Sequence, residues 1–234
     1  MIKRLFNRND NIAILIAGIF SIIIGLGVAR FAFTGLIPAM LDDYLTIKFV
    51  GILASLNFAG YLSGSIFSIF VKDINFKVYL YRFGIFLAIS TTFILAYSDN
   101  NTLWMVGRVL AGFAGAMCLI VGTSIVMQKL TIKSKTKAMG IHFSGIGFSI
   151  LTTDLLARFV LSLNYTWRDS WAVLAVFAII LSLYSVYILS FDKEVKQNAV
   201  KVKFDISIFT PFVIVLIIAY FTEGVGFVVQ ATFL

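Results

Sequence analysis

Residues Phe49–Val71 read FVGILASLNFAGYLSGSIFSIFV and contain no charged side chain. Two further stretches, Val109–Gln128 and Ser170–Phe191, are equally free of charge. A helix of about 20 residues, rising ~1.5 Å per residue, crosses a hydrocarbon core about 30 Å thick. Because a bilayer offers no water to backbone N–H and C=O groups, such stretches must be helices. The chain is therefore predicted to be an all-α membrane protein.

The composition excludes a soluble domain. Apolar residues make up 60% of the 234 residues and charged residues 13%, whereas soluble domains carry about 25% charged residues. The formal net charge is +8, but the charges lie between the apolar stretches. This placement argues for a lipid bilayer, and against nucleic acid, as the partner. The single cysteine, Cys118, excludes an intrachain disulfide and is predicted to be a small core residue.

Seven membrane spans are predicted from the apolar segments. The first is expected to be retained, since Met1–Arg8 leads into it without a small-residue cleavage site. The predicted spans are Ile12–Leu41, Phe49–Val71, Val78–Tyr97, Leu103–Met127, Ala138–Leu161, Ser170–Leu189 and Ile206–Leu234.

The Lys and Arg residues of the joints predict the orientation. Fourteen of the 19 lie in one set of joints, and the opposite joints hold Lys48 and Arg168, with Arg158 near a helix end. Cytoplasmic loops carry the excess of positive charge, so the amino terminus is expected in the cytoplasm of a cell (inner) membrane. The three tryptophans flank the sparsely charged side, as an interfacial belt does. The fourteen residues are Lys3, Arg4, Arg8, Lys72, Lys77, Arg82, Lys129, Lys133, Lys135, Lys137, Lys193, Lys196, Lys201 and Lys203.

The spans predict three parts of the chain. Residues 1–190 would form a six-helix amino-terminal half, and residues 191–205 a basic cytoplasmic linker. Residues 206–234 would form one further helix, the first of a carboxy-terminal half. Because no polar tail follows that helix, we expect a longer protein interrupted at its carboxy-terminal side.

Small residues at helical spacing predict close helix contacts, because membrane helices associate where backbones can approach. The first span offers Ser21, Gly25 and Ala29 on one face, and the second Ser55, Ala59 and Ser63 with Gly60 and Gly64 beside them. Packing is the expected role of these residues. The fourth and fifth spans carry Gly107, Ala111, Gly115, Gly140, Gly145 and Gly147.

Six segments together resemble the major facilitator superfamily, and within it the YbfB/YjiJ-like transporters. They are GVARFAFTGLIPAM at Gly27–Met40, LNFAGYLSG at Leu56–Gly64, RVLAG at Arg108–Gly112, GIHFSGIG at Gly140–Gly147, WRDSW at Trp167–Trp171, and EGVG at Glu223–Gly226 with ATFL at Ala231–Leu234.

The resemblance implies two six-helix halves around a central cavity, each built from a 3+3 inverted repeat and working by alternating access. It implies secondary active transport of a small solute, with coupling to protons as a further expectation. One departure is Gly64, which stands where this superfamily is expected to carry an aspartate. That departure weakens any transfer of the usual cytoplasmic latch to this chain.

Two charged residues are expected deep in the spans, where an arginine costs about 2.5–3.5 kcal/mol on insertion scales. Arg30 lies roughly 27 Å along the first span, counted from Ile12, and Glu223 roughly 26 Å along the last, counted from Ile206. For Arg30 the alternatives are a contact with a substrate anion or gate partner, and snorkelling to the surface. Glu223 suits a proton-coupling group or an interfacial carboxylate. Their similar depth suggests that they pair across the two halves.

Four further polar positions allow both functional and structural interpretations. Arg108 lies near the outer end of its span and could bind solute or snorkel. Asn57 is expected to make an interhelical hydrogen bond, with a site role as the alternative. His142 is interpreted as a packed, hydrogen-bonded core histidine or as a proton relay. Asp154 and Arg158, at i and i+4, predict a local ion pair. The interior arginines together favour an anionic group on the solute.

Other function classes lack their residues. A nucleotide-binding P-loop is absent from the sequence, and one histidine without an HExxH motif argues against a zinc enzyme. A retinal receptor needs a lysine that Ile206–Leu234 does not contain. We therefore expect no enzyme, cofactor or metal. The alternative to a transporter is a non-transporting remnant, or a half-transporter that needs a partner supplying the missing half.

Overall fold

The computed structural model describes residues 6–131, 135–190 and 210–233, except for the side chains of 225–233. The chain divides into a unit Met1–Lys196, called the bundle below, and a unit Gln197–Leu234. Of the seven predicted spans, six in the bundle are long and apolar enough to cross a membrane, by length and composition and within the described residues. The second unit contributes one further apolar helix, α10 (Pro211–Phe233).

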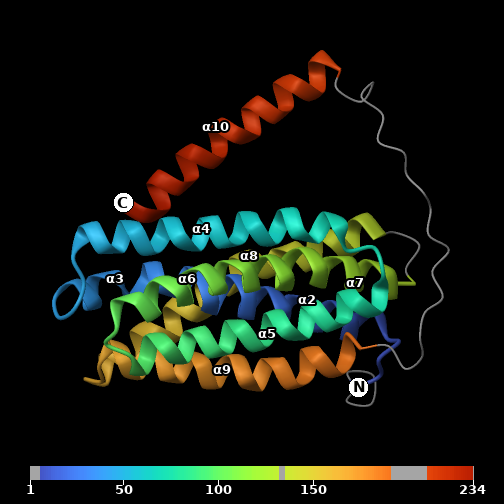
Figure 1. Ribbon diagram of the computed structural model, residues 1–234. Coiled ribbons are helices and arrows are strands. Elements are labelled where there is room, and N and C mark those ends of the chain that lie inside the picture. Colours follow the sequence, from blue (N-terminus) through green and yellow to red (C-terminus); the bar gives the residue numbers. More distant parts are fainter. Residues whose placement is uncertain (1–5, 132–134, 191–209, 234) are drawn as a thin grey trace. The chain divides into compact units, whose positions relative to one another are not determined.

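The bundle is built from helices that run antiparallel to their neighbours in sequence (Figure 1). Two of its spans are composite, with a π-helix between two α-helices. The first is α2 (Asn11–Ile22), η1 (Ile23–Phe31) and α3 (Ala32–Leu41), and the fourth is α6 (Asn101–Ala116), η2 (Met117–Val121) and α7 (Gly122–Lys129). The others are α4 (Ile47–Phe70), α5 (Ile74–Tyr97), α8 (Lys135–Ser162) and α9 (Trp167–Ile188).

Short polar side chains decide where several helices begin. Each accepts a hydrogen bond from a backbone N–H of the first turn, which has no partner inside the helix. These capping residues are Asp10, Thr46, Asp73, Asn100 and Thr166. Asp73 explains why α5 begins at Ile74 and not at the predicted Val78.

The last predicted span begins later than the sequence suggested. Thr210 is not helical, and its carbonyl and hydroxyl oxygens accept hydrogen bonds from Ile214 and Val213. Pro211 suits the first helical position because its missing N–H would have no partner there. The prediction of a helix starting at Ile206 is therefore wrong for Thr210, and residues 206–209 lie outside the described part.

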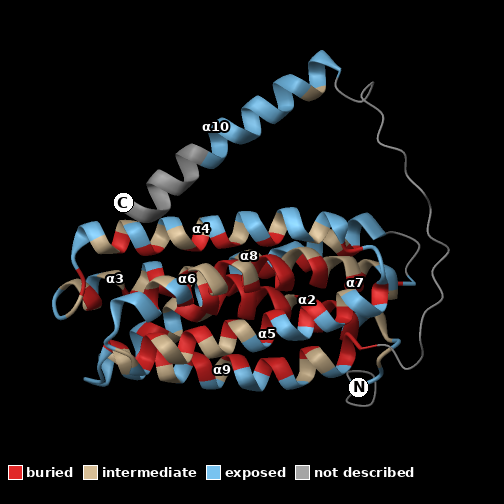
Figure 2. Ribbon diagram, in the orientation of Figure 1, coloured by how far each residue is buried: buried red, intermediate tan, exposed pale blue. Residues whose placement is uncertain are grey.

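The first span is the centre of the bundle. In the most apolar 18-residue stretch of this span, 78% of the residues are buried. The corresponding share is 33% in α4 and 28% in α8. Figure 2 shows exposed residues along the outer side of α4. The prediction for Ser21, Gly25 and Ala29 is confirmed, since all three are buried. For α4 the prediction is confirmed for Gly60 and Gly64 and is wrong for Ser55, Ala59 and Ser63.

Ser55, Ala59 and Ser63 are exposed in the bundle, and the packed face of α4 carries Gly60 and Gly64. Two faces of that helix both carry small residues, so sequence spacing alone did not separate them. In α8, Gly145 packs against Ile19, whereas a Cβ added to Gly140 or Gly147 would have no atom within 4 Å. Packing thus explains only part of the small-residue pattern.

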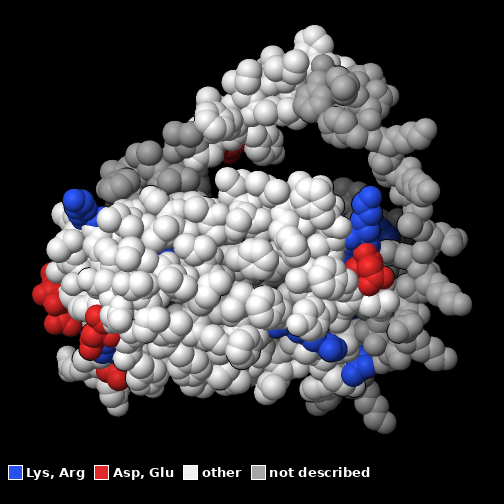
Figure 3. Space-filling model, in the orientation of Figure 1, with Lys and Arg blue, Asp and Glu red and all other residues white. Residues whose placement is uncertain are grey.

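Charged side chains gather at the two ends of the bundle, and the face between them is almost uncharged (Figure 3). We call the end that holds Arg8, Lys72, Lys77, Lys129 and Lys135 the basic end, and the other the acidic end. The acidic end carries Asp42, Asp43, Asp99 and Asp169. An uncharged face between charged ends is the surface expected of a protein embedded in lipid.

Candidate functional site

The candidate site lies where α4, α6 and η1 meet. Helices α4 and α6 cross with their backbones in contact, and two glycines permit it. A Cβ added to Gly60 would overlap the carbonyl oxygen of Val109, and one added to Gly112 would overlap that of Asn57. The glycine that follows Arg108 by four residues therefore serves close packing against α4.

A chain of side-chain hydrogen bonds ties the three helices together at this crossing. Asn57 Nδ2 donates to the carbonyl oxygen of Arg108, 3.1 Å away. Arg108 Nη1 in turn donates to the carbonyl oxygen of Ala29 in η1, 3.0 Å away. The predicted interhelical bond of Asn57 is confirmed, and it places Asn57 beside the backbone of Arg108.

Arg108 is inside the bundle and does not snorkel. Its relative exposure is 2%, and its guanidinium carbon lies 4.2 Å from the centre of the Phe33 ring. The Nε atom is buried and has no hydrogen-bond partner. The snorkelling alternative for Arg108 is wrong, because α4 and η1 cover it although its position on α6 is close to the helix start.

Arg30 is half-buried and faces aromatic rings. Its guanidinium carbon lies 4.4 Å from the centre of the Phe58 ring and 5.3 Å from that of Tyr61, both on α4. Phe31 contributes a third ring at 5.5 Å. Such contacts contribute about 0.5–2 kcal/mol each, the larger values where water is excluded. The aromatic cradle of Phe31, Phe58 and Tyr61 holds the charge near Arg108 and leaves part of it accessible.

Neither interior arginine has a carboxylate partner within the described residues. The ion pairs there join Arg158 to Asp154 and Arg168 to Asp99, both on the bundle surface. Arg108 Nη1 binds the carbonyl oxygen of Ala29, the residue that precedes Arg30, so the two arginines are neighbours at this crossing. The centre formed by these two side chains therefore holds two positive charges in an apolar environment, and the described part of the bundle places no negative charge beside them.

The two π-helices meet beside this centre. A Cβ on Gly25 in η1 would overlap that of Cys118 in η2, and Ser21 Oγ donates to the carbonyl oxygen of Cys118, 2.9 Å away. π-Helical segments are rare and occur frequently at functional sites. They occur here in the first and fourth spans, the positions that a 3+3 repeat makes equivalent.

Comparison with known proteins agrees with this architecture. Residues 22–234 match the family described as uncharacterised MFS-type transporter YbfB, where MFS stands for major facilitator superfamily. The chain belongs to this family. It is also 23% identical over 161 residues to a protein named TsgA homolog from Buchnera aphidicola subsp. Baizongia pistaciae (strain Bp). That match covers 68% of this chain and 41% of the relative, so the chain spans less than half of the relative's length.

Membership of the YbfB family confirms the predicted all-α multi-pass membrane fold of the superfamily. The family is one of transporters and not of enzymes. Within the described residues, no group of three or more His, Cys, Asp or Glu side chains is placed to hold a metal ion.

His142 lies apart from the arginines, nearer the basic end. Its Nε2 is 2.9 Å from the Thr123 hydroxyl, its Nδ1 is buried without a partner, and its relative exposure is 1%. A Cβ on Gly18 would come within 2.6 Å of Nδ1, so α2 closes over the ring. The structure thus has the packed, hydrogen-bonded histidine that the sequence suggested.

Glu223 is exposed on α10 and belongs to the second unit. Counted from Pro211, it lies 12 residues along the helix, roughly 18 Å, and not the 26 Å expected from Ile206. The matched depth that suggested a pair with Arg30 therefore does not follow from the helix bounds. Asp154 and Arg158 form the predicted local ion pair at 2.8 Å, and Cys118 is buried as predicted.

Two features of the site were not predicted. The aromatic cradle joins residues from two spans, and the sequence has no signal for which ring will face which charge. The sequence feature that comes nearest to predicting the cradle is the helical spacing of Asn57, Phe58 and Tyr61, which places all three toward one side of α4. The second feature is a polar link across the bundle, in which Tyr81 and Ser185 share a hydrogen bond and Ser185 Oγ donates to the carbonyl oxygen of Ala17.

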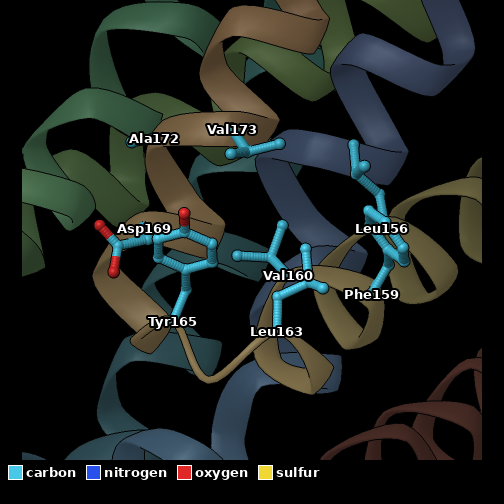
Figure 4. Close-up of a pocket in the computed structure, with 8 residues that line it drawn as sticks. All are labelled: Leu156, Phe159, Val160, Leu163, Tyr165, Asp169, Ala172 and Val173. Carbon is cyan, nitrogen blue, oxygen red and sulfur yellow. The ribbon is translucent and has the colours of Figure 1, made fainter.

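A separate cavity of about 410 Å³ lies between α8 and α9 at the acidic end (Figure 4). Apolar side chains line most of it, among them Leu156, Phe159 and Val173. Its one carboxylate, Asp169, already accepts hydrogen bonds from the backbone and hydroxyl of Thr166. The cavity contains none of the predicted site residues, and its acid is occupied by helix capping.

Proposed function

We propose that this chain is a secondary active transporter of a small solute that works by alternating access. The observation that carries the proposal is the Arg30–Arg108 centre. An unbalanced positive charge inside a membrane span is costly and marks substrate or ion pathways. The fold and the family support a role of this charge in transport. Asn57 contributes by holding α4 and α6 together around it.

In this proposal residues 1–190 form one half of the transport unit, residues 191–205 a cytoplasmic linker and residues 206–234 the first helix of a second half. Glu223 is the acid on the described part of α10, and we assign it proton coupling and a transient pair with Arg30. His142 would serve as a packing residue near the basic end, with proton transfer as its alternative role. The lack of a counter-charge for Arg30 within the described part of the bundle supports the pair with Glu223.

Transport is tested with the full chain reconstituted into liposomes that contain a pH-sensitive dye. Uptake of radiolabelled amino acids, sugars, amines and organic acids is followed with and without a pH gradient. We expect one class to accumulate only while the gradient persists. Arg30→Gln should abolish that uptake, and Arg158→Gln, an exposed arginine at the acidic end, should leave it intact. If no class of solute is taken up above the level of empty liposomes, the proposal is contradicted.

The pairing is tested by exchanging the two charges. Arg30→Glu and Glu223→Arg should each abolish uptake, and the double variant should recover part of it if the groups pair. If the double variant recovers no uptake although both single variants are inserted and folded, the pair is excluded and the transport proposal stands.

We also propose that the basic end faces the cytoplasm of the inner membrane. Lys48 and Lys135 lie at opposite ends and are exposed, while the native Cys118 is buried and shielded from reagents. With Lys48→Cys, an impermeant maleimide should label intact cells. With Lys135→Cys it should label only opened cells, and the reverse pattern would overturn the orientation.

A half-transporter that needs a second membrane chain is the other candidate. Helices α4 and α8 have the lowest buried shares of the six spans, 33% and 28%, so they offer the largest faces to a second chain. It predicts uptake only when a second chain is supplied, together with a complex larger than one chain in mild detergent. Uptake by the chain alone as a monomer would exclude it.

A further inference from the structure

We infer that the Arg30–Arg108 centre binds the carboxylate of a small monocarboxylic acid with an apolar, aromatic body. The inference rests on the proposed transport function and names the class of solute. It starts from the two guanidinium groups and the rings around them.

Charge balance calls for an anion at this place. Arg108 is 2% exposed, and its guanidinium binds the carbonyl oxygen of Ala29, next to Arg30 in the chain, so two positive charges lie close together. Arg108 carries the desolvation cost of a buried charge, half-buried Arg30 carries part of one, and repulsion between the two charges adds to it. A single negative charge bound beside the two guanidinium groups would offset both the desolvation cost and the repulsion.

The two arginines have different parts in binding. Arg108 has one N–H engaged with the Ala29 carbonyl oxygen and lies against the Phe33 ring, so it contributes charge from within the bundle. Arg30 is half-buried, and the described residues accept no hydrogen bond from its guanidinium. Its planar fork of N–H donors matches the two oxygens of a carboxylate. Arg30 is therefore the group that touches the anion.

The side chains around Arg30 indicate the chemistry of the rest of the ligand. Phe31, Phe58 and Tyr61 surround the guanidinium with rings, and these offer an apolar solute a stacking surface. A phosphate ester has three terminal oxygens and a higher charge, so it needs more donors. Within the described residues, the lysines lie near helix ends, at the two ends of the bundle, and supply none here. One accessible guanidinium with aromatic neighbours favours one carboxylate on an apolar body.

Binding is tested with the purified full chain in detergent, by equilibrium dialysis against radiolabelled benzoate. Benzamide serves as the uncharged analogue and phenyl phosphate as the phosphate analogue, each as a competitor. We expect benzoate to compete at least tenfold better than either. Equal competition by benzamide would overturn the anion site, and tighter competition by phenyl phosphate would overturn the carboxylate assignment.

Variants then locate the site. Arg30→Gln should weaken benzoate binding at least tenfold, and Arg30→Lys should restore only part of it, because lysine keeps the charge without the fork. Arg158→Gln is the matched control, an arginine at the acidic end whose partner is Asp154, and it should bind as the parent does. Thermal unfolding confirms that each variant is folded. A folded Arg30→Gln variant with undiminished affinity would refute the site.

Binding is measured without a membrane gradient, so its outcome is independent of transport. Benzoate binding without uptake in liposomes would defeat the proposed function and keep the anion site. Uptake of an uncharged solute by a chain that binds no benzoate would defeat the inference and keep the proposed function.

Discussion

Gly112 lies against the backbone of Asn57, so close that a Cβ on the glycine would overlap the Asn57 carbonyl oxygen. This contact sets the distance between α4 and α6. It also brings Asn57 Nδ2 within 3.1 Å of the carbonyl oxygen of Arg108. The charged centre is thus held in place by a glycine that carries no functional group.

Gly112→Ala is expected to destabilise the bundle, because α4 must move away from α6 to make room for a methyl group. Overpacking of a tight contact costs about 1–3 kcal/mol. The melting temperature in detergent should fall by several degrees. Gly147→Ala is the control, since nothing lies within 4 Å of its Cβ position. Equal melting temperatures for the two variants would mean that the crossing is not tight.

Arg108→Met is expected to keep or raise the stability of the bundle while weakening benzoate binding. Methionine is apolar and unbranched, although shorter than arginine. Removing a buried charge that has no carboxylate partner among the described residues recovers its desolvation cost, which offsets the lost hydrogen bond to Ala29. Removal of the second positive charge should lower benzoate affinity about fivefold or more. Thermal unfolding and dialysis on the same preparation separate the two effects. A large loss of stability would assign Arg108 a structural role instead.

Thr123→Val should destabilise the contact between α7 and α8. His142 Nδ1 already lacks a partner, and loss of the Thr123 hydroxyl would leave Nε2 unpaired as well. A buried polar atom without a partner costs about 1–3 kcal/mol. Thr123→Ser should retain the stability of the parent. Thr152→Val is the control, because that half-buried residue's hydroxyl bonds only to carbonyls of its own helix. Equal melting temperatures for Thr123→Val and Thr152→Val would show that the Thr123–His142 hydrogen bond does not contribute to stability.

The Tyr44 hydroxyl at the acidic end predicts a dependence on alkaline pH. It lies 2.8 Å from the Asp99 carbonyl oxygen and 2.9 Å from Asn101 Oδ1. Burial and the nearby Asp99 charge raise the pKa of Tyr44, although Arg168 opposes the shift. A pKa raised by folding means that the stabilising contribution is complete below the unfolded value of about 10 and is lost as pH rises further.

The comparison of the parent with Tyr44→Phe checks this. The parent should melt higher than the variant below about pH 10, and the difference should shrink above it. Tyr165→Phe removes the hydroxyl of an exposed tyrosine and is the control for loss of a hydroxyl group. A difference that is constant with pH would show that the hydroxyl proton is not involved.

The class of fold followed from the sequence alone, because backbone groups in lipid must bond within helices and apolar stretches of sufficient length have no other stable form. The same reasoning placed the six spans of the bundle to within a few residues at most boundaries. The Asp154–Arg158 pair was also predictable, since that bond depends only on spacing within one helix. The charge counts likewise separated the basic end of the bundle from the acidic end.

The role of each interior side chain, in contrast, emerged only from the packing of the helices. Arg108 could have reached the surface from its place near a helix start, but α4 and η1 cover it. The small residues of α4 lie on two faces, and packing selected Gly60 and Gly64 over Ser55 and Ala59. Contacts between helices depend on how each rotates about its axis, and that rotation is set by neighbours far away in sequence.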